Sequence, residues 1–232
     1  MIKYLLTLLL IAPLNLIAQQ FTPNPDWRFE NFNTQNHFIG RGVNDITMDK
    51  HGYIWTGSDG VQRFDGYKTV EFNSFDQSKG GLRGNYTSVI ADSSGRIWVC
   101  SQGLCRYDDA SGKFIYLNTD PKNRISSVDS FCLQGNNLWF VCDFGLARLD
   151  LKSLKVTYTS LTGITDPLVT YAINDSTMLI SSREKVYTYN IKNNTHTTRT
   201  LTYNHSLVKI FSILKTGDQI FFGDQLRFVF LQ

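Results

Sequence analysis

The chain has 232 residues, of which 42% are hydrophobic, 13% aromatic and 19% charged, and its formal net charge is +3. This composition is typical of a folded globular protein with enough apolar side chains for a core, and it excludes an intrinsically disordered chain. The charges are not clustered, so we expect no nucleic-acid partner, because binding to phosphates requires grouped Lys and Arg side chains.

The first 18 residues have the pattern of a secretory signal peptide. Lys3 supplies the positive end, an apolar run covers residues 5–17, and Ala18 precedes a polar pair. The run is shorter than the about 20 residues that a membrane helix needs, and Pro13 interrupts it. We therefore expect export and no membrane span in this chain. The alternative is a buried N-terminal helix.

Residues 19–42 form a polar lead-in to the rest of the chain. Within it, Trp27–Phe32 alternates large apolar and polar side chains, which predicts a short strand. No partner for a hairpin lies nearby in the sequence.

The remainder of the chain repeats one pattern. Between residues 43 and 72, three short apolar runs are separated by two turn sequences, and the same order returns at 86–117 and 128–158. Trp55, Trp98 and Trp139 mark the second predicted strand of these units, about 40 residues apart. Two weaker copies follow, with Leu179 and Phe221 at the equivalent position.

Each unit predicts four antiparallel strands, which is the signature of a β-propeller blade. We expect an all-β fold with about five blades, at about 43–80, 85–120, 127–160, 168–202 and 207–232. The last copy stops after its third strand. The fold is therefore a partial ring or, alternatively, a closed five-bladed ring that Trp27–Phe32 completes. The three Trp residues are interpreted as structural, because a large flat side chain suits packing against the next blade.

Four cysteines stand at positions 100, 105, 132 and 142. They form no Cys-x-x-Cys pair and no His lies at ligand spacing, so we expect no metal and no cofactor. Cys100 and Cys105 flank a tight turn, and an exported chain meets an oxidising compartment, so these two are candidates for a disulfide. The alternative is that all four are small buried hydrophobic side chains.

The motif Asp-x-x-Gly-x-Ile-Trp-x-Gly-x-x-Gly-Val-x-Arg-Phe-Asp-Gly, at Asp49–Gly66, resembles the two-component regulator propeller repeat family. The resemblance covers 43–158 well and 168–231 loosely. Cys100 stands where that family usually has Gly, and the third unit lacks the Asp-x-x-Gly. The resemblance implies a periplasmic sensor region, a ring closed by an N-terminal strand such as 27–32, and an oligosaccharide ligand. It also implies a membrane span and a histidine kinase, neither of which this sequence contains, so further sensor chain or a like subunit is an expected partner.

Propellers bind ligands where loops converge around the central channel. The connections that lead into each first strand nominate the ligand-binding residues Arg41, Asn44, Asn85, Tyr86, Ser127, Asp129 and Tyr171. The alternative is that these side chains only satisfy the hydrogen bonds of ordinary loops.

The sequence favours a ligand-sensing module without enzymatic activity. Its Asp residues mostly recur at turns and strand ends, where they serve each blade, and no Gly-x-Ser-x-Gly motif occurs. Two further interpretations stay open: a truncated copy that does not signal, and a scaffold for protein interactions.

Overall fold

The structure is a computed structural model. It describes residues 42–58, 60–73, 82, 88–117, 128–142, 145–164, 167–182, 185–203, 206–207, 210–217, 219–223 and 228–231. The chain divides into two units, 1–32 and 33–232, and all described residues belong to the second. The expected signal peptide and the strand expected at 27–32 therefore lie outside the described residues.

The described residues form antiparallel sheets whose strands follow one another in chain order. The first sheet contains β1 (Asp45–Met48), β2 (Ile54–Gly57), β3 (Gly60–Phe64) and β4 (Thr69–Asn73). The second contains β5 (Ser88–Ala91), β6 (Ile97–Ser101), β7 (Gly103–Asp108) and β8 (Lys113–Tyr116). The third contains β9 (Val128–Gln134), β10 (Asn137–Cys142), β11 (Gly145–Asp150) and β12 (Val156–Thr159).

The two weak sequence copies also form sheets. The fourth sheet contains β13 (Val169–Asn174), β14 (Thr177–Ser181), β15 (Lys185–Asn190) and β16 (Thr195–Thr200). The fifth has three strands, β19 (Ser212–Thr216), β20 (Gln219–Gly223) and β21 (Phe228–Leu231). Between them lies a hairpin that the sequence pattern did not predict, β17 (Thr202–Tyr203) with β18 (Ser206–Leu207). The predicted all-β fold of four-stranded antiparallel sheets is confirmed.

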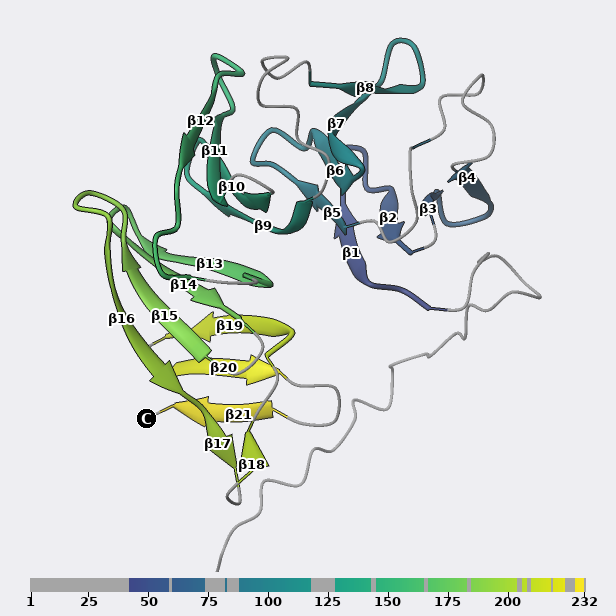
Figure 1. Ribbon diagram of the computed structural model, residues 1–232. Coiled ribbons are helices and arrows are strands. Elements are labelled where there is room, and N and C mark those ends of the chain that lie inside the picture. Colours follow the sequence, from purple (N-terminus) through teal and green to yellow (C-terminus); the bar gives the residue numbers. More distant parts are fainter. Residues whose placement is uncertain are drawn as a thin grey trace, which may run out of the picture. The chain divides into compact units, whose positions relative to one another are not determined.

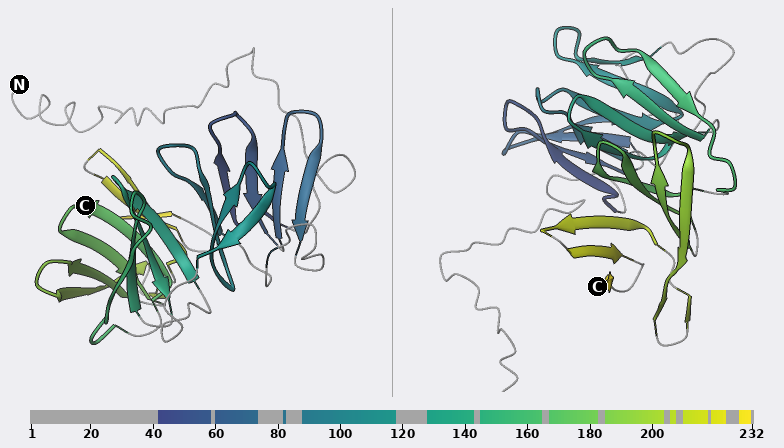
Figure 2. Two further views of the ribbon diagram at one scale, coloured as in Figure 1. Left: turned by 90° about the horizontal axis from the view of Figure 1, so that it is seen from above. Right: turned by 90° about the vertical axis from the view of Figure 1, so that its left-hand side faces the viewer.

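Successive sheets meet along their first strands. β1 contacts β5, β5 contacts β9, β9 contacts β13, and β13 contacts β19. Figure 1 shows these strands following one another in the order of the chain, and Figure 2 shows the sheets, coloured along the sequence, from two further sides. The arrangement is that of propeller blades, in which the innermost strands of neighbouring blades lie side by side.

The core consists of layers between neighbouring sheets. Trp55 on β2 is fully buried in a cluster with Val89, Val99 and Phe114 of the second sheet. Its ring lies 4.8 Å from that of Tyr107, edge to face. The Trp of the first repeat therefore packs into the apolar layer between its own sheet and the next one.

The same position fills the next three interfaces. Trp98 on β6 packs against Leu138 and Phe140 of the third sheet. Trp139 on β10 packs against Met178 and Ile180 of the fourth. In the fourth sheet Leu179 takes this place and packs against Ile210 and Phe222. The structural interpretation of the three Trp residues agrees with this packing, since burying a large aromatic side chain contributes several kcal/mol to such interfaces.

A hydrogen bond joins each of the first two Trp residues to the turn that precedes its strand. Asp49 accepts the indole N–H of Trp55 with Oδ2 at 2.7 Å, and accepts the backbone N–H groups of His51 and Tyr53 with Oδ1. Asp92 does the same for Trp98, at 2.9 Å. One carboxylate therefore closes the turn and satisfies a buried indole donor, which explains why Asp and Trp recur together at this spacing.

Candidate ligand-binding site

A cavity of about 760 Å³ lies between the first strands of the five sheets. Each of β1, β5, β9, β13 and β19 contributes to its wall. The described residues that line it are Asn44, Asp45, Ile46, Thr47, Ser88, Val89, Ile90, Ser130, Phe131, Cys132, Leu133, Leu168, Val169, Thr170, Tyr171, Ala172, Phe211, Ser212 and Ile213. This volume is in the range of pockets that hold small molecules.

The structure brings two of the seven nominated ligand-binding residues to this cavity. Asn44, exposed just before β1, and Tyr171, half-buried on β13, both line it. Asp129 is part of β9 but is not among the described lining residues, and its side chain lies outside the described part of the structure. The other four nominated positions, Arg41, Asn85, Tyr86 and Ser127, lie outside the described residues.

Asp45 carries the charge of the cavity wall. It is the only Asp, Glu, Lys, Arg or His among the described residues that line the cavity. Burial raises the pKa of its carboxyl group above the usual value, and hydrogen bonds from the Ser88 hydroxyl and the Val89 amide lower that pKa in part. These two partners are uncharged and come from the neighbouring strand β5, so no cation of the described residues neutralises this carboxylate.

Hydroxyl groups tie neighbouring first strands together along the cavity. The amide of Ala91 on β5 donates to Thr47 Oγ1 on β1 at 3.1 Å. The amide of Thr170 on β13 donates to Ser130 Oγ on β9 at 3.3 Å. These hydroxyls accept backbone donors that no strand pairing would satisfy, because the first strands of two sheets are not joined as one ladder.

The hydroxyl of Thr170 differs from the others. Its residue is only 3% exposed, and its Oγ1 makes no well-formed hydrogen bond within the described residues. It lies beside the thiol of Cys132, a weak partner, and burial raises the pKa of that thiol to about 11. A buried hydroxyl that lacks a good partner beside a cavity is suited to bind a polar group of a ligand.

Polar and apolar groups contribute about equally to the surface of the wall. Apart from the hydroxyl of Ser212, its remaining side chains are apolar or aromatic. Phe131 and Tyr171 are half-buried and also pack against the cores of neighbouring interfaces, whereas Phe211 is 47% exposed. Apolar surface combined with fixed polar groups is typical of small-molecule sites.

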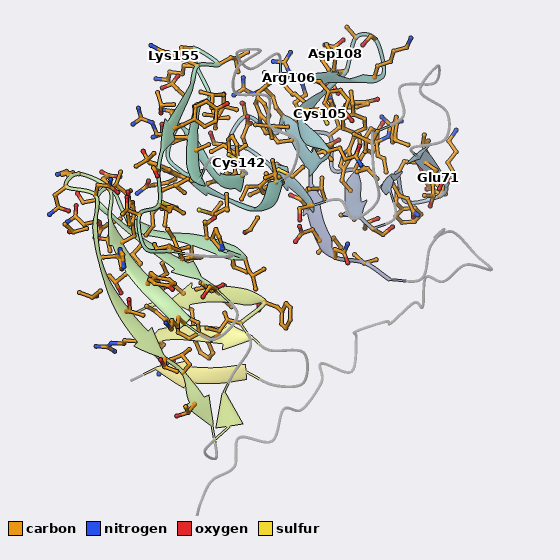
Figure 3. The ribbon with its side chains drawn as sticks, viewed as in Figure 1. Glu71, Cys105, Arg106, Asp108, Cys142 and Lys155 are labelled. Atoms are coloured by element: carbon orange, nitrogen blue, oxygen red, sulfur yellow. The ribbon has the colours of Figure 1, made fainter. Side chains whose placement is uncertain are left out.

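The structure contradicts the disulfide between Cys100 and Cys105. Cys100 pairs with Leu104 and Cys105 with Val99, so the two cysteines occupy adjacent positions across the hairpin and point to opposite faces of the sheet. Cys100 packs in the layer towards the third sheet and Cys105 in the layer towards the first. The cysteines form no disulfide with each other or with Cys132 and Cys142. Cys105 on β7 and Cys142 on β10 come from different sheets (Figure 3).

Sequence reasoning missed the polar residues within the first strands. It placed the site on the connections between sheets, whereas Asp45, Ser88 and Thr170 lie on the strands themselves. A signal was present: polar residues, Asp45 and Ser88, begin β1 and β5, and Asp is depleted in strands.

No protein-family model matches the sequence, and no curated protein matches it significantly. Similar folds are found among solved structures. The chain superimposes on the extracellular domain of one hybrid two-component system from B. thetaiotaomicron with a TM-score of 0.72 and 18% identity, covering 88% of this chain and 30% of that one. For a second such domain from the same organism the TM-score is 0.65 at 18% identity, covering 84% of this chain and 27% of that one.

An enzyme shares the fold as well. Virginiamycin B lyase from Staphylococcus aureus superimposes with a TM-score of 0.59 and 16% identity over 78% of this chain and 62% of the lyase. In the described part of the chain, no helix has the length and hydrophobicity of a membrane span. The chain spans 30% and 27% of the length of these two extracellular domains, and it shares with them an all-β fold of propeller-like repeated sheets.

Proposed function

We propose that this chain is an extracytoplasmic ligand-sensing module of a two-component signalling system, located in the periplasm, with its ligand bound in the cavity between the first strands. The likeness to extracellular domains of hybrid two-component systems supports the sensing role. The sequence motif at Asp49–Gly66 supports it independently. A glycan fragment is the proposed ligand, because hydroxyl groups and aromatic rings line the cavity.

The cavity itself is the observation that carries this proposal. All five sheets contribute to its wall, so a ligand bound there contacts every sheet at once. Such a ligand stabilises the arrangement of the sheets relative to one another, and stabilisation of one arrangement is how a binding event changes a receptor's state.

Binding without catalysis is the activity we propose. Hydrolysis of a glycoside usually needs two carboxyl groups across a cleft. The described residues that line the cavity supply one, Asp45.

The experiment is a binding screen with a cavity-blocking variant. The full chain, exported by the expression host, is titrated calorimetrically with a panel of neutral, acidic and amino oligosaccharides. Ser212→Trp places a bulky side chain at an exposed position of the wall, and Thr197→Trp places the same side chain at an exposed position of β16, away from the cavity. We expect at least one oligosaccharide to bind the wild type and Thr197→Trp, and to lose at least tenfold in affinity for Ser212→Trp.

Three other outcomes would contradict part or all of this proposal. Binding that Ser212→Trp leaves unchanged would place the ligand elsewhere and contradict the proposed site. If no oligosaccharide binds and a periplasmic protein is retained instead, the interaction scaffold replaces the sensor. If neither is found, the chain is the non-signalling copy.

A further inference from the structure

The charge of the cavity wall is unbalanced. Asp45 is the only Asp, Glu, Lys, Arg or His among the described residues of the wall, and its hydrogen-bond partners, the Ser88 hydroxyl and the Val89 amide, are both neutral. No ion pair involving Asp45 occurs within the described part of the chain. A carboxylate that is partly buried and has no cation beside it is unfavourable, and only a cation or a proton neutralises its charge.

The other acidic side chains of the sheets have a different role. Asp65 directly follows β3, Asp108 and Asp150 end β7 and β11, and each accepts at least one backbone N–H of the turn that follows. Asp92 is paired with Arg96 at 2.6 Å. Their structural duties are visible in these bonds. Asp45 closes no turn and pairs with no cation of the described chain; its hydrogen bonds come from the Ser88 hydroxyl and the Val89 amide of β5.

A second observation points to a ligand independently of this charge. Thr170, on β13, brings to the same cavity a buried hydroxyl whose one neighbouring partner within the described residues is the thiol of Cys132, a weak hydrogen-bond acceptor. Asp45 lies on β1, in another sheet, so the cavity has polar anchors on two separate parts of its wall. Tyr171 and Phe131 add aromatic surface to the wall, and aromatic faces attract cations.

We propose that the ligand of this cavity carries one ammonium group, that Asp45 is its counter-ion, and that Thr170 accepts or donates a hydrogen bond to a second polar group of the same molecule. The inference rests on the proposed function and names its ligand class. Carboxylate, sulfate and phosphate ligands are disfavoured, because they would place a second negative charge beside Asp45.

The test compares probes that share one body and carry an ammonium group, a neutral group or a carboxylate on it. Glucosamine, benzylamine and n-butylamine present an ammonium group on a sugar, an aromatic and an aliphatic body. Their neutral counterparts are N-acetylglucosamine, benzyl alcohol and n-butanol, and their anionic counterparts are glucuronate, benzoate and butyrate. Dissociation constants for the full chain are measured by calorimetry or ligand-observed NMR at pH 7. For at least one body, we expect the amine to bind tenfold or more tightly than both counterparts.

Three variants assign that preference to Asp45. Asp45→Asn keeps the shape and removes the charge, so the amine and its neutral counterpart should bind alike. Asp45→Glu keeps the charge and should retain part of the preference. Asp175→Asn, at an exposed turn position, is the matched control and should leave the preference unchanged. Circular dichroism and a urea unfolding curve for each variant establish that it is folded.

The outcomes separate this inference from the proposed function. If no amine is preferred over its neutral counterpart, or if Asp45→Asn keeps the full preference, the ammonium ligand is wrong. In that case an oligosaccharide that binds the wild type and loses affinity for Ser212→Trp would still support the proposed function. If neither the amines nor any oligosaccharide binds, both the ammonium ligand and the proposed function are wrong.

Discussion

At the scale of single residues, one carboxylate in each of the first two sheets does two tasks. Asp49 and Asp92 each hold a turn closed and accept the indole proton of a Trp six positions later. In the third sheet the acceptor stands five positions before the Trp instead of six: Gln134, the last residue of β9, accepts the indole N–H of Trp139 with Oε1 at 2.9 Å.

Removing this link should be more destabilising than removing an ordinary turn residue. We expect Asp49→Ala to lower the free energy of unfolding by about 3 kcal/mol, because it leaves a buried indole donor and two amide groups without their acceptor. Asn174→Ala is the matched control: Asn174 accepts the Ser176 amide in its turn, and Leu179, which has no donor to satisfy, replaces the Trp. Asn174→Ala should lower the free energy of unfolding by about 1 kcal/mol.

A double-mutant cycle isolates the hydrogen bond itself. Asp49→Ala and Trp55→Phe, measured singly and together by urea unfolding, should show a coupling energy of about 1–2 kcal/mol. A coupling energy near zero would mean that Asp49 acts only on its turn.

The packing of the recurrent Trp residues could be predicted from the sequence, whereas their hydrogen bonds to the turns could not. The recurrence of Trp predicts packing against a neighbouring sheet, because a buried ring of that size needs an apolar partner surface. The second task of Asp49 was not predicted, because the turn alone explains an Asp at that position. Only the three-dimensional path of the turn brings Oδ2 to the indole nitrogen.

At the scale of elements, the turns of neighbouring sheets touch. Gly95 in the turn before β6 has a φ of +74°, and a Cβ atom there would lie 2.4 Å from Cβ of Lys50 in the turn before β2. Beside them, Lys50 and Asp109 form an ion pair at 2.9 Å, and Arg96 donates from Nη2 to the Leu151 carbonyl of the third sheet. Neighbouring sheets are therefore held together by contacts between their turns as well as by the apolar layers.

Substitutions at Gly52 and Gly95 distinguish two effects on the free energy of unfolding: the strain of a positive φ, and the close contact between the turns that contain Gly95 and Lys50. Gly52, with a φ of +84°, has open space where a Cβ atom would lie, with no neighbouring atom within 4 Å, so Gly52→Ala should cost only the about 1–2 kcal/mol of a left-handed alanine. Gly95→Ala has the same strain and also a clash with the Lys50 backbone, so it should lower the free energy of unfolding by about 1–3 kcal/mol more than Gly52→Ala does. Equal urea midpoints for the two variants would show that the turns do not touch in solution.

The fold could be predicted from the sequence better than the site could, because the repeat pattern describes single strands and not how strands of different sheets are arranged. A repeat of alternating side chains fixes which residues share a sheet face, and hence the layers of the core. It does not reveal which strand edges come together around a cavity. Tyr171 and Asn44 were nominated from their place near the start of first strands, whereas Asp45 and Ser88 were assigned to the strands as ordinary members.

At the scale of the whole molecule, acidic groups with opposite pKa shifts set the response to pH. The pKa of Asp65, Asp108 and Asp150 is lowered, mainly by hydrogen bonds from the turns that follow them. Burial would raise the pKa of Asp92, but hydrogen bonds from Trp98, Ser94 and Arg96 outweigh it and the pKa is lowered. Stability from these groups is present above the unfolded pKa of about 4 and is lost as the pH falls through their folded pKa values.

Asp45 acts in the opposite direction. Its raised pKa means that the folded chain binds its proton more tightly, so its contribution to stability is lost as the pH rises through the folded pKa. We expect the unfolding free energy of the wild type to decrease below about pH 4. Asp92→Asn should flatten this decrease and Asp45→Asn should steepen it, as measured by urea unfolding between pH 3 and 7. Identical slopes for the two variants would contradict the assigned shifts.

The order of the sheets has a consequence for how the chain folds. Within each sheet every strand pairs with the next one in the sequence, and each first strand contacts those of the neighbouring sheets. Most native contacts are therefore local for a β protein, which favours fast folding and lowers the entropy lost in closing each loop. As the chain emerges N-terminus first, each new sheet finds its docking surface already formed by the sheet before it.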